Sequence, residues 1–491
     1  MLQKEKTNIS GQENSNHKER LLTLSEFRRE LGIPLVIAKR IVIMGEVGAV
    51  KAIDGTIVIA ESEMRKIAGI IRNPWQKTKL FWKALGPGLI TGASDDDPSG
   101  IGTYSSVGAQ FGFSILWMAA WLLPMMLAIQ EVCARIGIIT NKGLAGVLQK
   151  HYKKKIVFLV VLLLIIANIA NIGADLGAMA ASLAMLMPVN IYMAAIFFAA
   201  LSIIVEVFVG YHVYVKFLKW LTVSVLAYVV TGFIIHPDWS VILKNTFIPR
   251  ISFNAAYLFA IIAVFGTSIT PYLFFWQASE EVEENKLVHK LVFKRDKKHD
   301  RILRMRTDVR AGMILANVVF FFIVLTTAQV LFNNGITNIA SAHEAALALK
   351  PLAGNHAFLL FALGIIGTGL LAVPILAGSG AYALSELMKW NEGLELKFSQ
   401  AKGFYMVIIL SIIFGLSINF LDINPIKALY YSAYLNGIIA LPLLIVIMVV
   451  GNDKKIMGIE THPLWVKIFG WAAVIFMALA VIASIILSFV K

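Results

Sequence analysis

The sequence predicts an all-α membrane protein with a small soluble domain near its N-terminus, on three observations. Of its 491 residues, 58% are apolar and only 15% are charged, whereas soluble domains average about 45–50% and about 25%. Apolar segments of about 20 residues, long enough to cross a bilayer as helix, recur through most of the chain. Two of these segments are interrupted by Gly, Pro and polar residues. The excess apolar surface must therefore face lipid, and two helices must break within the membrane.

Eleven membrane spans are expected within a membrane domain of residues 80–491. They cover residues 84–109, 113–134, 156–186, 190–209, 214–236, 254–277, 309–333, 357–380, 402–421, 426–450 and 465–489. Lys and Arg cluster in alternate connections, for example at Lys153–Lys155 and Lys454–Lys455, while the other connections carry few. The positive-inside rule then places the N-terminus in the cytoplasm and the C-terminal Lys491 outside. We expect the location to be the cell membrane of a prokaryote.

A soluble module is expected over residues 21–75, after a tail, 1–20, that is polar enough to be disordered. The module should contain an amphipathic helix, a second helix over 35–44, a β-hairpin turning at Asp54-Gly55, and a helix from Glu61. This order resembles the winged-helix domains of excisionases and MerR-type regulators. Nucleic-acid contact is one interpretation of the module, and a regulatory or structural role is the interpretation that we favour.

Three consecutive carboxylates, Asp95–Asp97, lie inside the first expected span. One charge at the bilayer centre costs about 2.5–3.5 kcal/mol on insertion scales. Pro98 lacks an amide hydrogen and Gly100 permits unusual backbone angles, so a helix break that frees carbonyl oxygens for a cation is expected. The plainer alternative is a re-entrant segment whose aspartates face water. Adjacent helical residues point about 100° apart, so Asp95 is expected to be the most dispensable of the three.

The sixth span contains a matching interruption, Gly266-Thr267-Ser268-Ile269-Thr270-Pro271. When the first ten spans are divided into two halves of five, both breaks fall in the first span of their half. This placement is typical of inverted repeats, in which two discontinuous helices form a binding site near the membrane midplane. The predicted fold is thus a 5+5 inverted repeat followed by an eleventh helix.

Two stretches resemble the Nramp family of divalent-metal transporters: Gly86–Gly92 followed by Asp97-Pro98, and Ala134–Thr140 at the end of the second span. The resemblance covers about residues 84–490 and implies a LeuT-like fold with alternating access. It also implies that Asp97 binds the metal through its carboxylate, and that Ser94 and Thr267 bind it through backbone carbonyls.

The sequence also departs from the family pattern. The family motif Asp-Pro-Gly-Asn reads Asp97-Pro98-Ser99-Gly100 here, so Gly100 replaces an Asn ligand. Thr270 replaces a Met and Tyr272 a His. The remaining oxygen donors, with Asp96 as a second carboxylate, suit hard cations better than a thioether does. Mg²⁺ keeps several waters, and Gly100 leaves room for them. These features are similar to the Nramp-related magnesium transporters, so we predict Mg²⁺ as the transported ion, with Mn²⁺ also accepted and no resident cofactor.

The proton relay shared by symporters of this family is incomplete in the sequence. Asp175 remains, but a second acid is missing at Ala178, span nine has no basic residue between Phe404 and Phe420, and Tyr272 stands at the His position. We therefore predict uptake uncoupled from protons, because two charges gain about 4.6 kcal/mol per 100 mV. The alternative is a proton-coupled Mn²⁺/Fe²⁺ symporter of the same fold.

Other polar residues of the spans have two interpretations each. Asp175 is either a remnant of the relay or a paired structural acid. Asn436 either supports the broken helices or joins neighbouring helices, which is the interpretation we favour. Glu131 is expected to pair with Arg135 one turn later. Glu280–Glu284 is interpreted as a solvated helix face in preference to a cation exit.

Several functional classes conflict with the sequence. A channel would require a ring of like ligands from symmetric subunits, and an enzyme would require a motif such as His-Glu-x-x-His, which is missing. The single cysteine, Cys133, excludes disulfides and multi-thiolate metal sites. The net charge of +14 is explained mainly by the basic cytoplasmic connections. The expected partners are a divalent ion and the lipid bilayer, and the oligomeric state is left open.

Overall fold

The computed structural model describes residues 21–31, 49–51, 57–71, 91–92, 94–209, 223–291, 298–394, 396–458 and 462–489. The tail 1–20, the helix expected over 35–44, the Asp54-Gly55 turn and the stretch 86–90 lie outside these residues. The chain divides into two compact units, described separately here. One comprises Met1–Leu85 with Val288–Arg295, and the other Gly86–Leu287 with Asp296–Lys491.

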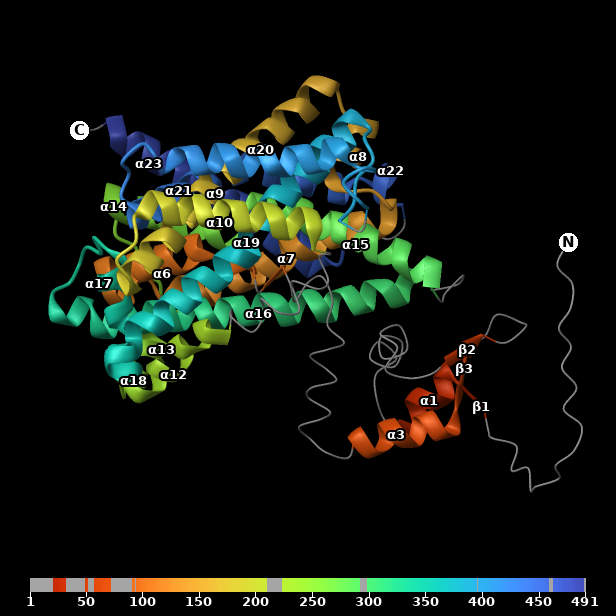
Figure 1. The fold of residues 1–491 in the computed structure, drawn as a ribbon, viewed down its shortest axis with the longest axis horizontal. Coiled ribbons are helices and arrows are strands. Elements are labelled where there is room, and N and C mark those ends of the chain that lie inside the picture. Colours follow the sequence, from red (N-terminus) through yellow and green to blue (C-terminus); the bar gives the residue numbers. More distant parts are fainter. Residues whose placement is uncertain are drawn as a thin grey trace, which may run out of the picture. The chain divides into compact units, whose positions relative to one another are not determined.

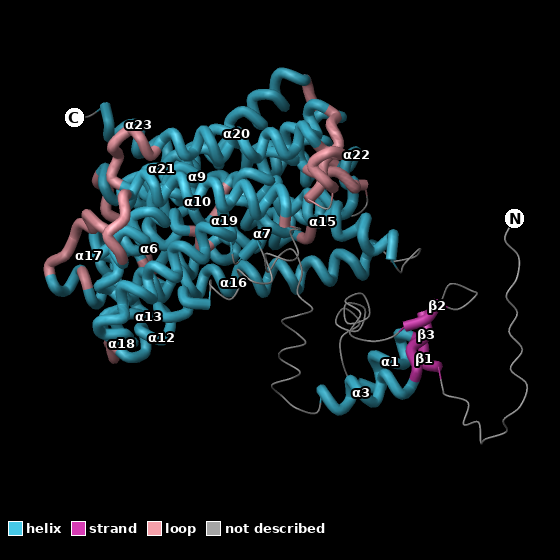
Figure 2. Tube along the Cα trace, in the orientation of Figure 1, coloured by secondary structure: helices cyan, strands magenta, loops and turns pink. Residues whose placement is uncertain are grey.

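The described residues of the N-terminal unit form two helices and a three-stranded antiparallel sheet (Figure 2). Its elements are β1 (Leu21–Thr23), α1 (Leu24–Leu31), β2 (Ala49–Lys51), β3 (Ile57–Ala60) and α3 (Glu61–Ile71). The strand order is β1-β3-β2, with Leu22 opposite Ile59 and Val50 opposite Val58. Thr23 caps α1, because its Oγ1 accepts from the Glu26 amide at 3.3 Å while its own amide donates to the Glu26 carboxylate at 2.8 Å. The winged-helix interpretation stays a prediction.

Apart from the two breaks and a few residues at span ends, the described residues of every expected span are helical (Figure 1). Its longer helices are α6 (Pro98–Phe111), α7 (Trp117–Thr140), α9 (Lys154–Leu186), α10 (Ile191–Phe208), α14 (Ala255–Ser268), α15 (Pro271–Leu291), α16 (Lys298–Val330), α19 (Ala357–Met388), α20 (Lys402–Ile418), α21 (Pro425–Asn452) and α23 (Leu464–Phe489). Shorter helices are α8 (Leu144–His151), α12 (Ala227–Ile234), α13 (Trp239–Phe247), α17 (Ala342–Ala346), α18 (Lys350–Ala353) and α22 (Lys454–Met457). Eight helices of the described residues are long and apolar enough to cross a membrane.

The packing places the two broken segments at the centre of the bundle. α9 packs against α19, α20 and α21, while α14 packs against α21 and α6. Small residues allow the close approach of α14 to α21, because a Cβ on Gly266 would collide with the backbone of Ala433 and Gly437. Large apolar side chains such as Phe158 and Ile475 are exposed on the outside, as expected for surfaces that face lipid.

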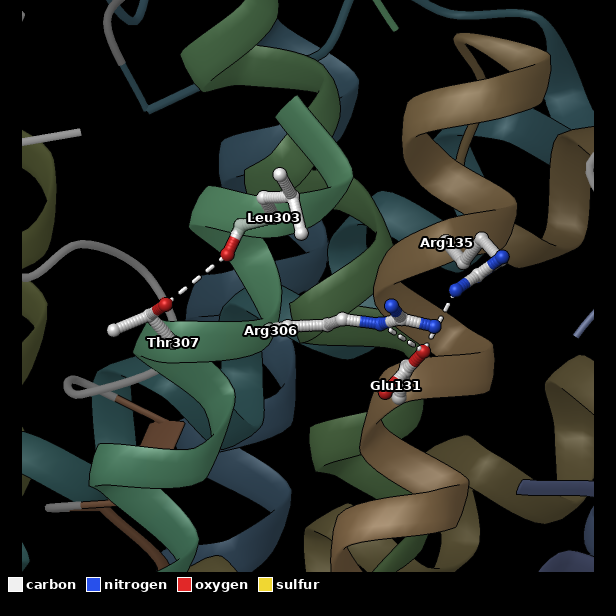
Figure 3. Close-up of polar contacts among 5 residues, drawn as sticks. All are labelled: Glu131, Arg135, Leu303, Arg306 and Thr307. Carbon is white, nitrogen blue, oxygen red and sulfur yellow. Dashed lines mark hydrogen bonds and ion pairs between the residues drawn. The ribbon is translucent and has the colours of Figure 1, made fainter. Parts of the chain in front are cut away.

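A buried ion cluster joins α7 to α16 (Figure 3). The Glu131 Oε1 atom accepts from Arg135 Nη2 and from Arg306 Nε, both at 2.7 Å. The pairing of Glu131 with Arg135 is therefore confirmed, and the contribution from α16 is additional. His462 lies beside this cluster; its burial, followed by the charges of Arg135, Lys467 and Arg306, lowers the pKa of the imidazole to about 3. The imidazole is therefore neutral near pH 7, and the carboxylate is shared by the two arginines.

Glu131→Gln is expected to lower the free energy of unfolding by about 3–5 kcal/mol, because it removes the buried negative charge that Arg135 and Arg306 share. Arg306→Gln should cost less, since the Arg306 side chain is 26% exposed. Melting of the purified protein in detergent measures both, with Lys402→Gln at an exposed position as the control. Equal melting temperatures for Glu131→Gln and the control would contradict a stabilising role of the cluster.

Candidate metal site

The first broken helix turns at the aspartate triplet. Residues 91, 92, 94 and 95 are helical, the chain bends at Asp96, and Asp97 is extended with φ −67° and ψ 172°. α6 then begins at Pro98, where a missing amide hydrogen costs nothing. Asp97 caps this helix, because its Oδ1 accepts from the Gly100 amide at 2.6 Å. The helix break expected from the sequence is present.

The second Asp97 oxygen is held by a chain of amides. Its Oδ2 accepts from Asn171 Nδ2 of α9 at 3.1 Å, and Asn171 Oδ1 accepts from Asn436 Nδ2 of α21 at 3.2 Å. Asn436 thus orients Asn171, which in turn orients Asp97. Asp175, one turn after Asn171, also reaches the start of α6, where its Oδ1 accepts from the Ser99 amide at 3.1 Å. The Asp175 Oδ2 atom is buried and has no hydrogen-bond partner.

The sixth span breaks between α14 and α15, at Ile269 and Thr270. Thr267 and Thr270 are both buried, and the Thr270 hydroxyl has no hydrogen-bond partner. Tyr272, in the first turn of α15, donates from its hydroxyl to the Ser94 carbonyl oxygen at 2.6 Å. This bond joins the two breaks directly, and it gives Tyr272 a structural contact with a carbonyl that the family resemblance implies to be a metal ligand.

The site contains more acidic than basic side chains. Asp95, Asp96 and Asp97 are 1%, 5% and 1% exposed. Both Asp95 carboxylate oxygens and Oδ1 of Asp96 have no hydrogen-bond partner. Among the described residues the buried basic side chains are Arg135 and His462, which belong to the Glu131 cluster. Buried carboxylates without a partner are costly, so the arrangement is suited to receive a cation.

Gly100 contributes its amide and no side chain, in close-packed surroundings. Its amide is used by Asp97, so the residue offers no side-chain ligand. A Cβ placed on Gly100 would lie 3.0 Å from the Asp95 carbonyl oxygen and 3.5 Å from Asp97 Oδ1. A larger side chain at this position would therefore occupy the space beside both aspartates.

Two cavities are lined by different sets of helices, one by α6, α14 and α21 and the other by α8, α15 and α19. In Figure 1 the labels of α14 and α8 lie toward opposite ends of the helical bundle. The first has a volume of about 540 Å³ and is lined by residues of α6, α14 and α21, including Gln110, Phe259 and Tyr430. The second has a volume of about 300 Å³, and its lining includes Glu283 and Glu386. The aspartate triplet is buried and lines neither cavity.

The prediction that Glu280–Glu284 form a solvated helix face is wrong for the first two residues. Glu280 and Glu281 are buried, because this part of α15 still packs inside the bundle. Glu281 Oε1 accepts from Gln277 Nε2 at 3.0 Å, and Gln277 Oε1 accepts from the Thr91 hydroxyl at 2.6 Å. The acidic segment is therefore linked to the first broken helix.

Asn171 and Gln277 were not identified from the sequence. A signal for Asn171 was present, because Asn168, Asn171 and Asp175 recur at intervals of three and four residues in an otherwise apolar helix. Such spacing places polar groups on one helix face. No comparable spacing in the sequence identifies Gln277.

Comparison with known proteins gives consistent results over this part of the chain. The family described as "Natural resistance-associated macrophage protein-like" matches residues 88–487. The divalent metal cation transporter MntH of Klebsiella pneumoniae subsp. pneumoniae is 25% identical over 403 residues, which cover 81% of this chain and 92% of that protein. MntH of a second Klebsiella pneumoniae strain is 24% identical over the same shares.

Two solved structures share the fold. The Eremococcus coleocola manganese transporter matches with a TM-score of 0.64 and 18% identity, over 82% of this chain and 86% of that one. Mhp1, a nucleobase-cation-symport-1 family transporter in a closed conformation, matches with a TM-score of 0.51 and 14% identity, over 82% and 92%. These likenesses confirm the predicted LeuT-like helical fold.

Proposed function

Because this chain belongs to the Nramp family, we propose that it carries Mg²⁺, with Mn²⁺ also accepted, across a cell membrane without proton coupling. Transport of divalent metal ions follows from family membership, and the proposal concerns the ion and its driving force. The proposed orientation follows the positive-inside rule, with the N-terminus in the cytoplasm and the C-terminus outside. The ion crosses by alternating access between the two cavities, while the paired breaks hold it at the midplane.

One observation carries the choice of Mg²⁺, namely the donor set of the two breaks. The groups at the breaks are the Asp97 carboxylate, the unpartnered Asp96 Oδ1 atom and the unpartnered Thr270 hydroxyl, together with the Ser94 and Thr267 backbone carbonyls. Carboxylate, hydroxyl and carbonyl oxygens suit hard cations. Gly100 offers no side-chain ligand where the family motif has Asn, which supports an ion that keeps part of its water, as Mg²⁺ does.

Uptake into proteoliposomes tests the choice of ion. Purified protein is reconstituted around a Mg²⁺-sensitive dye, and uptake of Mg²⁺, Mn²⁺ and Ca²⁺ is compared at a potassium-diffusion potential. We expect saturable Mg²⁺ uptake that Mn²⁺ inhibits. If Mn²⁺ enters while Mg²⁺ neither enters nor competes, the proposal is wrong and the Mn²⁺/Fe²⁺ alternative is favoured.

Metal uptake is expected to leave the internal pH of the liposomes unchanged. The groups at the relay positions are engaged in structural bonds, since Asp175 accepts from the Ser99 amide and Tyr272 donates to the Ser94 carbonyl. A pH-sensitive dye trapped in the same liposomes provides the measurement, and a proton ionophore serves as the positive control. Acidification that depends on the metal would show that protons travel with it.

A further inference from the structure

A narrow crevice lies between α8, α9 and α21. It is lined by apolar side chains alone, among them Leu148 of α8, Val160 of α9, and Ile447 and Val450 of α21. A water molecule placed there would find no polar side chain to bond, whereas a hydrocarbon chain needs none. The crevice is therefore suited to an apolar ligand, and the bilayer around the protein supplies one.

Exposed lysines lie at the ends of the same helices. They are Lys150, Lys153, Lys154, Lys155, Lys454 and Lys455. The first four lie where α8 ends and α9 begins, and the last two begin α22, directly after α21. Within the described residues none of them forms an ion pair. The carboxylate of Asp453, which precedes α22, caps that helix by accepting from the Lys455 amide at 2.8 Å. The ammonium groups are therefore available to an anion from outside the protein.

The fold brings the two groups of lysines to the crevice. The crevice residues Leu148 and Val450 each precede a lysine by no more than four residues. Asp453, between α21 and α22, acts electrostatically on the Tyr152 hydroxyl, between α8 and α9. The two connections thus lie near each other, as do the labels of α8 and α22 in Figure 1. The positive-inside rule explains lysines on the cytoplasmic side, but it does not require them to flank an apolar crevice.

We propose that the crevice and the lysines beside it bind an anionic phospholipid of the cytoplasmic leaflet. The lysines contact the headgroup phosphate as point charges, and one acyl chain lies at the crevice. The second chain runs along the outer face of α9, where Ile156 and Leu159 are 44% and 55% exposed. The leaflet follows from the proposed orientation, whereas the site does not depend on which ion the protein carries.

Binding of phosphatidylglycerol to the full chain in detergent tests the proposal. Native mass spectrometry counts the lipids that stay bound, and a titration gives their affinity. We expect Lys454→Gln/Lys455→Gln to weaken phosphatidylglycerol binding at least about tenfold, because two headgroup contacts are lost. Val160→Phe, which fills the crevice without changing the charge, should also weaken it. Lys397→Gln/Lys402→Gln removes two exposed lysines from another cytoplasmic connection and is the matched control, which should bind like the wild type.

Two further ligands separate the headgroup from the chains. Phosphatidylcholine with the same acyl chains should bind weakly to every variant, and glycerol phosphate should not compete at the concentrations at which phosphatidylglycerol binds. Equal phosphatidylglycerol affinity in the wild type and Lys454→Gln/Lys455→Gln would overturn the proposal. An equal loss in the control pair would reduce the lysines to a general positive surface, and competition by glycerol phosphate would make the site one for a free anion. Melting of each variant without added lipid shows that it is folded, and the exposed lysine pair keeps the test valid if Val160→Phe is not.

Discussion

Asp97→Asn is expected to reduce Mg²⁺ uptake at least about a hundredfold, since removing one member of a buried charge pair costs about 3–5 kcal/mol. Asn keeps an oxygen that accepts from the Gly100 amide, so the cap of α6 is retained. Only the negative charge of the side chain at position 97 is lost. The measurement is initial uptake per reconstituted molecule at a fixed inside-negative potential.

A matched control separates this effect from any general loss of acidic residues. Asp422 is exposed and its Oδ1 accepts from the Tyr192 hydroxyl at 2.6 Å, a bond that Asn also makes. Asp422→Asn should transport like the wild type. A tenfold reduction of uptake corresponds to about 1.4 kcal/mol. If Asp97→Asn retains more than about a tenth of the wild-type uptake, Asp97 is not the central ligand.

The double variant Gly100→Asn/Thr270→Met is expected to shift the preference from Mg²⁺ to Mn²⁺ about tenfold or more, or about 1.4 kcal/mol. The Asn side chain adds a direct ligand and displaces water beside Asp97, and the Met thioether favours softer metals. The site has to relax slightly, because the Cβ at position 100 would lie 3.0 Å from the Asp95 carbonyl oxygen. Competition of the two ions for uptake gives the ratio.

Two single changes are the controls for this double variant. Gly100→Ala fills the same space without adding a ligand, so it should weaken Mg²⁺ transport without improving Mn²⁺ transport. Thr270→Met alone should raise the relative preference for Mn²⁺ while leaving the space at Gly100 open. An unchanged ratio in the double variant would mean that selectivity is determined outside the two breaks.

The spans and their breaks could be predicted because their causes are local in the sequence. Twenty apolar residues in succession indicate a span, and Pro98 and Pro271 each begin a helix after a break, as the sequence suggested. The partners of the site could not be predicted in the same way. The contacts of Asp97 with Asn171, and of Tyr272 with Ser94, depend on how distant helices pack.

The acidic segment of α15 shows why a local pattern can mislead. Four glutamates within five residues indicate a solvated surface when they are considered alone. In the fold, Glu280 and Glu281 are buried and Gln277 bonds to Glu281. Whether a charged stretch meets water is decided by the depth to which its helix packs, which the sequence of that helix does not contain.

The reversal potential of the metal current tests uncoupled Mg²⁺ transport most directly. Currents are recorded from reconstituted membranes with a tenfold Mg²⁺ gradient, first at equal pH and then with a pH gradient imposed. Because each ion carries two charges, we predict a reversal near the Mg²⁺ equilibrium potential, a shift of about 30 mV per tenfold gradient, that the pH gradient leaves unchanged. A reversal potential that moves with the pH gradient, or that ignores Mg²⁺, would contradict the account.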